Sequence, residues 1–255
     1  MKRSYIYTIT LLLCSAFQVT VNAQNVKIPD ANFKRILIDL GTDTNGDGEI
    51  QLSEAKQVTK LYVDKAEIGS LEGIKSFVNL DELGCYDNQL KTLDIEGMPK
   101  LRAVYAFNNQ IQSIKVKGAA NLQDLYLSYN KLRVVNLVGV PKLKDLRLDN
   151  NYITKLSLSN LPALEVVEIY KNQMNEFEGQ ALPALKKLNM RENYYEIVDL
   201  TLLKSLEEVD LSRCEFLTIL DIRGLRKLRS LDCDGPNRLV NMNMSGTVSL
   251  TKFSW

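Results

Sequence analysis

The sequence of 255 residues contains no histidine. This absence excludes Ser-His-Asp and Cys-His nucleophilic systems, HExxH zinc sites and acid–base catalysis by imidazole. Lys and Arg together number 32 and Asp and Glu 31, so the chain has no basic excess with which to bind nucleic-acid phosphates. After the N-terminal segment, no hydrophobic run reaches the roughly 18 to 20 residues of a membrane span. We therefore expect a globular protein that has no membrane span and does not bind nucleic acid.

Residues 1–23 are predicted to be a signal peptide. Lys2 and Arg3 give a positive start, a mostly apolar run follows, and Ala23 supplies the small residue before cleavage at Gln24. The sequence therefore predicts an exported protein, either periplasmic, on the cell surface or secreted. The alternative interpretation is an uncleaved membrane anchor.

Cysteine is scarce, and its count does not suit a disulfide framework. Beyond Cys14 in the signal peptide, only Cys85, Cys214 and Cys233 remain, and an exported protein built on disulfides would show an even and denser set. We expect three buried thiols. Lipid attachment at Cys14 is a further alternative, but Leu13 stands where lipoprotein signals resemble one another in having Gly, Ala or Ser.

One repeat dominates the sequence from Leu80 onward. Leucines recur at a constant interval that widens by one only in the last two rows, namely Leu80, Leu101, Leu122, Leu143, Leu164, Leu185, Leu206, Leu228 and Leu250. An asparagine recurs at the ninth position of six rows, namely Asn88, Asn109, Asn130, Asn151, Asn172 and Asn193, and Cys214 replaces it in the seventh. Such a fixed period is the signature of a repeat architecture.

Each row has the residue types of one short strand followed by a turn. The L-x-x-L-x-L segment alternates apolar and polar residues, which predicts a strand with one buried face. The asparagine amide can satisfy backbone groups that the turn leaves unpaired. A single row cannot bury its apolar face, but stacked rows can, with strands about 4.8 Å apart in one parallel sheet.

These rows resemble the leucine-rich repeat family, and their second apolar pair after the asparagine, as in Leu156 and Leu158, resembles the bacterial internalin type. The resemblance implies an α/β-type repeat solenoid, a right-handed superhelix of about nine repeats over residues 61–255. It also implies one parallel sheet on a concave face that binds other macromolecules, usually proteins.

Residues 24–60 are predicted to form a small helical cap on this array. Phe33, Ile36, Leu37 and Leu40 follow a helical spacing. The next segment matches the calcium loop of an EF-hand, with Gly48 at the sharp turn. The ligands would be the side chains of Asp43, Asn45, Asp47 and Glu54 and the carbonyl of Glu49.

Calcium (Ca²⁺) in this loop would have a structural role, because a single loop without a Met-rich partner helix does not suit a sensor. Internalins resemble this chain in beginning with a cap of EF-hand-like shape, which covers the open end of the array. The alternative interpretation is a polar turn that never binds metal.

Partner binding is expected on the outward-facing positions of the strands. Aromatic residues gather there, and the predicted binding patch is Tyr62, Tyr86, Tyr105, Phe107, Tyr126, Tyr129 and Tyr170. Tyr and Phe are common at interface hot spots, so a protein ligand is favoured. The alternatives are a glycan stacked on the tyrosines and an aromatic ladder that only stiffens the sheet. Mixed charges in later rows, such as Arg147, Asp149 and Glu168, resemble a solvated rim.

No enzyme is predicted, because the carboxylates lie along a ladder without a phosphate loop, a nucleophile elbow or a second domain to form a cleft. At the other end, Phe253 and Trp255 fall on inward positions and are expected to plug the open end of the array. The bare strand edge beyond them predicts weak association of two copies.

Overall fold

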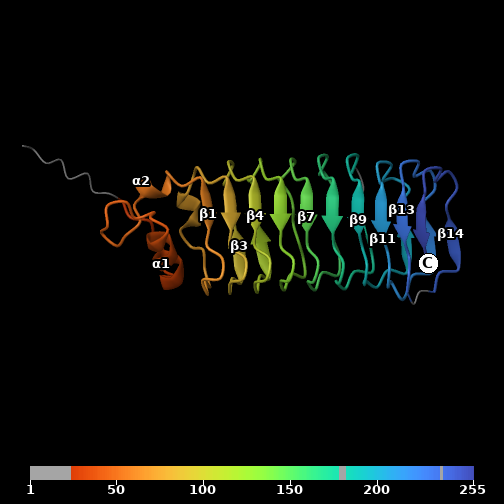
Figure 1. The fold of residues 1–255 in the computed structure, drawn as a ribbon, viewed down its shortest axis with the longest axis horizontal. Coiled ribbons are helices and arrows are strands. Elements are labelled where there is room, and N and C mark those ends of the chain that lie inside the picture. Colours follow the sequence, from red (N-terminus) through yellow and green to blue (C-terminus); the bar gives the residue numbers. More distant parts are fainter. Residues whose placement is uncertain (1–23, 178–181, 236–237) are drawn as a thin grey trace, which may run out of the picture.

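The computed structural model describes residues 24–177, 182–235 and 238–255. The predicted signal peptide and Cys14 lie outside these residues. The described chain forms an elongated stack with a small helical unit at its N-terminal end (Figure 1). That unit contains α1 (Ala31–Asp39) and α2 (Leu52–Ala55), and a 3₁₀ turn, η1 (Ile74–Ser76), follows the first strand of the stack.

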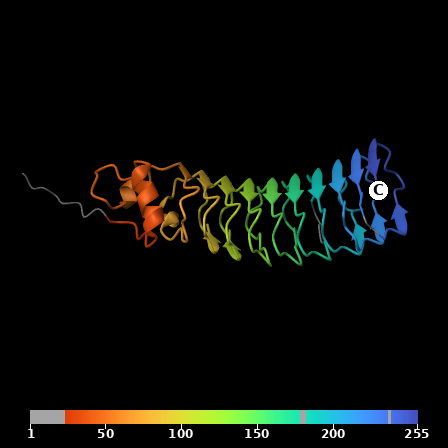
Figure 2. The same ribbon diagram turned by 60° about the horizontal axis from the view of Figure 1, so that its bottom comes forward.

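A parallel sheet of ten strands runs the length of the stack. Its strands are, in spatial order, β1 (Lys60–Tyr62), β2 (Glu82–Gly84), β4 (Ala103–Tyr105), β6 (Asp124–Tyr126), β7 (Asp145–Arg147), β8 (Val166–Glu168), β9 (Lys187–Asn189), β11 (Glu208–Asp210), β13 (Ser230–Asp232) and β15 (Lys252–Ser254). Figure 2 shows these strands on the inner side of a gentle curve.

Two smaller sheets lie on the opposite side of the stack, where the sequence predicted no strands. They are formed by β3 (Thr92–Asp94) with β5 (Ser113–Lys115), and by β10 (Ile197–Asp199), β12 (Ile219–Asp221) and β14 (Asn241–Asn243). Strands of both sheets carry an inward apolar residue, such as Leu93 or Val198. The second apolar pair of a row therefore has the same alternation as a strand, and neighbouring rows can pair there too.

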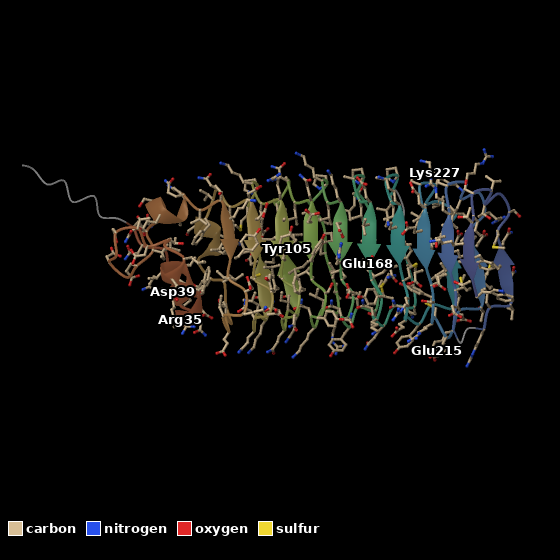
Figure 3. All side chains as sticks on the ribbon, viewed as in Figure 1. Arg35, Asp39, Tyr105, Glu168, Glu215 and Lys227 are labelled. Atoms are coloured by element: carbon tan, nitrogen blue, oxygen red, sulfur yellow. The ribbon has the colours of Figure 1, made fainter. Side chains whose placement is uncertain are left out.

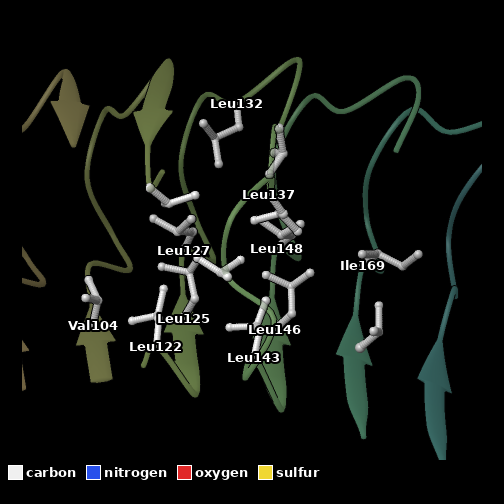
Figure 4. Packing of buried hydrophobic residues seen from close by; sticks show 14 of the residues in the cluster. Val104, Leu122, Leu125, Leu127, Leu132, Leu137, Leu143, Leu146, Leu148 and Ile169 are labelled. Carbon is white, nitrogen blue, oxygen red and sulfur yellow. The ribbon is translucent and has the colours of Figure 1, made fainter. Parts of the chain in front are cut away.

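The register confirms that each row forms one turn of the solenoid. Tyr105 pairs with Tyr126, and Tyr126 pairs with Arg147, each one row further along the chain. Residues at the same position of successive rows therefore form columns. The inward columns are dry, since Leu122, Leu143 and Leu164 are all fully buried, and Figure 4 shows the leucines of neighbouring rows packed against each other.

The repeated asparagines form a second, polar column inside the turns. All six are buried, with 2 to 9% of their surface exposed. Asn151 is typical: its Oδ1 accepts a hydrogen bond from Leu132 N at 2.9 Å. Its Nδ2 donates to Leu127 O at 3.0 Å and to Leu148 O at 2.9 Å. Each asparagine thus joins two consecutive rows through backbone groups that would otherwise be buried without partners.

This asparagine column is interrupted at Cys214. Its Sγ donates to Met190 O at 3.5 Å. This carbonyl is equivalent to Ile169 O, which accepts from Asn193 Nδ2 one row earlier. The thiol replaces the amide donor but offers only a weak acceptor. Among the described residues, no acceptor is present for the buried N–H of Tyr195, whose counterpart Met174 N donates to Asn193.

The three cysteines of the array are buried, as predicted. Burial raises the pKa of the Cys85 and Cys233 thiols to about 12. Reactivity needs the thiolate, so these groups behave as small apolar side chains.

Phe253 and Trp255 do not bury themselves at the end of the array as predicted. They retain 42% and 71% exposure, and no further row packs on them among the described residues.

Asp30 links the helical unit to the array, together with the hydrogen bond from Asn32 Nδ2 to Glu67 O and the ion pair of Lys27 with Glu72. Asp30 caps α1 through hydrogen bonds from Asn32 N and Phe33 N. Its other oxygen accepts from Gly69 N at 2.8 Å and Ser70 N at 2.9 Å, in the first irregular row. Phe33 is fully buried in the same core as the leucine columns, so α1 closes their N-terminal end.

We expect Cys214→Asn to stabilise the protein by about 1 kcal/mol, because the amide oxygen can accept from Tyr195 N and remove the cost of an unsatisfied buried donor. Urea unfolding followed by circular dichroism measures the change. The matched control is Cys85→Asn, which places the same amide on an inward apolar position and should lower stability. An equal loss of unfolding free energy in Cys214→Asn and Cys85→Asn would contradict this account of the turn.

Candidate binding surface on the concave face

The columns bring the predicted aromatic residues together in pairs. Tyr86 and Phe107 stack with ring centroids 4.5 Å apart and planes 8° apart. Tyr105 and Tyr126 meet edge to face at 5.2 Å. The prediction that residues of neighbouring rows lie within stacking distance is confirmed for these four.

Four of the seven predicted aromatics line a single open hollow of about 540 Å³, which we call the concave hollow. Its lining is Phe107, Tyr126, Ser128, Tyr129, Arg147, Asp149, Glu168 and Tyr170. Tyr105 lies beside it through its contact with Tyr126. Figure 3 labels Tyr105 and Glu168 on nearby strands of the main sheet.

Tyr62 and Tyr86 lie outside the lining of the hollow. Tyr62, on β1, donates a hydrogen bond to Glu82, and this bond raises the pKa of Tyr62 to about 12. The neighbouring Asp64 raises the pKa of Tyr86 as well. The seven-residue patch predicted from the sequence is therefore divided between a hollow and an N-terminal stretch of tyrosines paired with acids.

Charged side chains are part of the hollow, which corrects the prediction that they form a solvated rim. Arg147 covers one face of the Tyr126 ring, with its guanidinium carbon 4.3 Å from the centroid. The same guanidinium pairs with Asp145 at 3.0 Å, and the Tyr126 hydroxyl donates to Asp145 at 2.9 Å. Burial and this hydrogen bond raise the pKa of Tyr126 to about 12.

Asp149 and Glu168 are the acids that line the hollow. Asp149 is only 4% exposed and accepts hydrogen bonds from Ser128 Oγ at 2.5 Å and from Asn150 Nδ2 at 2.9 Å. Burial, together with Asp149, raises the pKa of Tyr170 to about 12. Partial burial also raises the pKa of Glu168, although its neighbours Asn189 and Arg147 act in the opposite direction. Asp149 occupies the seventh position of its row, as Phe107 does, and Glu168 occupies the fifth, as Tyr126 does. These matching positions are the sequence signal that could have placed both acids in the site.

Tyr129 is the most exposed aromatic of the hollow, at 55%. It occupies the eighth position of its row, where the backbone is left-handed in seven successive rows; its φ is 55°. Asn108 and Asn150 occupy the same position in the adjacent rows. A non-glycine residue in this region carries strain, which the stacked turns on either side maintain. Tyr129 therefore lines the hollow while about half of its surface stays open to solvent.

The predicted calcium loop folds around its own acidic side chains. Asp43 accepts from Gly46 N at 2.8 Å and from Gly48 N at 2.9 Å, and Gly48 has the positive φ of 80° that the sharp turn needs. Asn45 Oδ1 accepts from Asp47 N, and Asp47 Oδ1 accepts from Glu49 N, both at 2.9 Å. The loop is thus ordered by its own hydrogen bonds.

Glu54, the twelfth loop residue, is buried and reaches back across the loop. One carboxylate oxygen accepts from Thr44 N at 2.7 Å and the other from Gln51 N at 2.9 Å. The Glu49 side chain pairs with Lys34 of α1 at 2.5 Å. Within the described residues, no three His, Cys, Asp or Glu side chains are gathered closely enough to hold a metal ion. The donor set has the oxygen chemistry that calcium prefers, since a carboxylate accepts about four hydrogen bonds and keeps capacity for a cation.

A larger hollow of about 1180 Å³ lies at the smaller sheet of β10, β12 and β14 and was not anticipated. Its aromatic residues Tyr194 and Phe216 meet at 5.8 Å, and Arg238 lies 5.6 Å from the Phe216 centroid. No sequence signal marked it, because Tyr194 and Phe216 fall on different positions of their rows.

No protein-family model matches the sequence, and no curated protein matches it either. Solved structures do match. An internalin, InlF, from Listeria monocytogenes shares 18% identity, with a TM-score of 0.51 over 89% of this chain and 96% of its own. The fold is that of a leucine-rich repeat solenoid.

Two other leucine-rich repeat structures are also similar. The leucine-rich repeat domain of APL1B shares 23% identity and has a TM-score of 0.64, over 80% of this chain and 65% of that domain. A chain of the LRIM1/APL1C complex shares 21% identity and has a TM-score of 0.58, over 75% of this chain and 42% of its own. The chain therefore spans less than two thirds of the length of these two relatives. In the part of the chain that the structure describes, no helix is long and apolar enough to cross a membrane.

Proposed function

We propose that the protein is an exported, non-catalytic recognition module that binds a protein partner through the concave hollow. The observation that supports this most directly is the placement of exposed Tyr129 beside ordered polar groups in one hollow of the main sheet. Aromatic anchors surrounded by satisfied polar side chains are typical of protein interfaces. Export is proposed from the leader sequence alone.

The covered faces of several aromatic rings favour a protein ligand over a glycan. Sugars stack on open aromatic faces, but one face of Tyr126 is covered by Arg147, and Tyr86 and Phe107 cover each other. One similar structure, that of LRIM1/APL1C, is a complex. Weak association of two copies through the edge of β15 stays a prediction.

We expect Tyr129→Asp to abolish retention of the partner, because it removes the exposed aromatic anchor of the concave hollow. Purified protein serves as bait for exported proteins, and the retained proteins are identified by mass spectrometry. Tyr152→Asp is the matched control, since Tyr152 is also exposed but lies outside the concave hollow.

The proposal requires a partner that the wild-type and Tyr152→Asp proteins retain and Tyr129→Asp does not. Retention unaffected by Tyr129→Asp would contradict it. Binding on a sugar array with no protein partner would favour the glycan alternative.

We further propose that Ca²⁺ stabilises the N-terminal unit. Asp43, Asn45, Asp47 and Glu54 would provide side-chain oxygens and Glu49 its carbonyl, and the cation would offset the repulsion of these carboxylates. The loop leads into α2, and Gln51 pairs with Asn25 in an antiparallel bridge at the start of the described chain. Holding the loop would therefore also hold the start of the described chain against the segment that leads into α2.

We expect Ca²⁺ to raise the melting temperature of the wild-type protein relative to EGTA. A metal present at 100 times its Kd adds about 2.7 kcal/mol of stability. Asp43→Ala should lose the effect, whereas Asp39→Ala, which removes an acid at the end of α1, should keep it. Thermal melts followed by circular dichroism provide the measurement. Superimposable wild-type melts in Ca²⁺ and EGTA would eliminate the calcium proposal and leave the solenoid intact.

A further inference from the structure

The concave hollow and its edge hold more acids than bases. Asp124, Asp145, Asp149 and Glu168 face this part of the sheet. The cations that act on Asp124 and Glu168 are Arg147, Lys144 and Arg102, and Arg102 is paired with Asp81. Asp124 and Asp145 are directly paired on β6 and β7, so their carboxylates lie on one face in adjacent rows. Like charges so placed repel each other.

Arg147 is not free to neutralise the group, because Asp145 already holds it. Its Nε and Nη2 atoms donate to the two oxygens of Asp145 at 3.2 and 3.0 Å, and the guanidinium also lies over Tyr126. This two-point contact is the strongest geometry for an arginine and a carboxylate. A nearby cation, Lys171, is turned toward Glu192 at 3.9 Å.

The remaining carboxylates lack a cationic partner. Asp124 makes no side-chain hydrogen bond or ion pair within the described residues. Burial and the neighbouring Asp145 raise its pKa, and burial raises that of Glu168. Asp149 is satisfied by hydroxyl and amide donors, which leave its charge in place. The free protein therefore keeps uncompensated negative charge at an aromatic surface.

Aromatic walls strengthen the preference for a cation. Tyr129 and Tyr170 line the hollow together with Glu168. The face of a tyrosine ring attracts an ammonium or guanidinium group, and more strongly where water is excluded. An acid beside such rings provides a charge-assisted hydrogen bond to the same group.

We infer that the partner docks through a basic segment, with a Lys or Arg side chain seated in the concave hollow among Tyr129, Tyr170 and Glu168. This inference rests on the proposed function and adds the chemistry of the ligand. The carboxylates supply the charge complementarity, and the tyrosines supply the contact area. An acidic or uncharged segment would leave the carboxylates of the hollow unpaired and partly desolvated.

Calorimetric titration with a capped peptide of four Arg-Gly repeats tests the inference. We expect the wild-type protein to bind this peptide, and not peptides of Ser-Gly or Glu-Gly repeats of the same length. Glu168→Gln and Asp124→Asn should each weaken binding about tenfold, which is the change expected from the loss of about 1.4 kcal/mol of charge pairing. Both replacements keep the size and shape of the side chain, so folding should persist.

Glu96→Gln is the matched control, because it removes an exposed acid after β3, on the opposite side of the solenoid. It should leave the affinity for the Arg-Gly peptide unchanged. Equal binding by all variants would mean general attraction to an acidic surface and would overturn the inference, as would absence of binding to the wild-type protein. In either case, a partner that Tyr129→Asp fails to retain would preserve the proposed function, whereas failure of both experiments would reject both proposals.

Discussion

The buried asparagine column is the interaction on which the rest of the structure depends. A stack of short strands leaves backbone groups unpaired wherever the chain turns inside the protein, and burying such groups without partners is costly. Each asparagine satisfies groups from two consecutive rows at once, as Asn151 does with Leu127 O of the preceding row and Leu148 O of its own row. Leucine burial drives the rows together, but it is not directional. The directional hydrogen bonds of the asparagines fix the register between consecutive rows.

This fixed register creates the candidate site. Phe107, Tyr126 and Tyr170 come from three different rows, yet they line one hollow because their rows are stacked without slippage. The same rule brings Arg147 over Tyr126 and places Asp124 beside Asp145. The candidate binding residues therefore lie at equivalent positions of successive rows rather than on long loops. A single substitution changes the contribution of one row to such a column.

The sequence predicted the stack, the inward leucines and the role of asparagine, because these follow from a constant repeat period and from simple hydrogen-bonding needs. It also predicted that Tyr105 and Tyr126 meet. It did not place Asp149 or Glu168 in the hollow, since burial of an outward-facing acid depends on the curvature of the sheet and on the neighbouring side chains. The second contact of Asp30, with Gly69 and Ser70, joins segments that are distant in the sequence and has no local signature.

The most direct measurement of the central claim is the free energy of unfolding of Asn151→Ala. The substitution leaves the buried Leu132 N without its partner. It also removes one of the two asparagine donors from Leu127 O and from Leu148 O, which keep Asn130 Nδ2 and Asn172 Nδ2 respectively. We expect a loss of about 2 kcal/mol. Asn150→Gly removes the neighbouring side chain while allowing the left-handed backbone, and should change stability by less than about 0.5 kcal/mol. A loss for Asn151→Ala no larger than that of Asn150→Gly would contradict the claim that the buried asparagines hold the rows together.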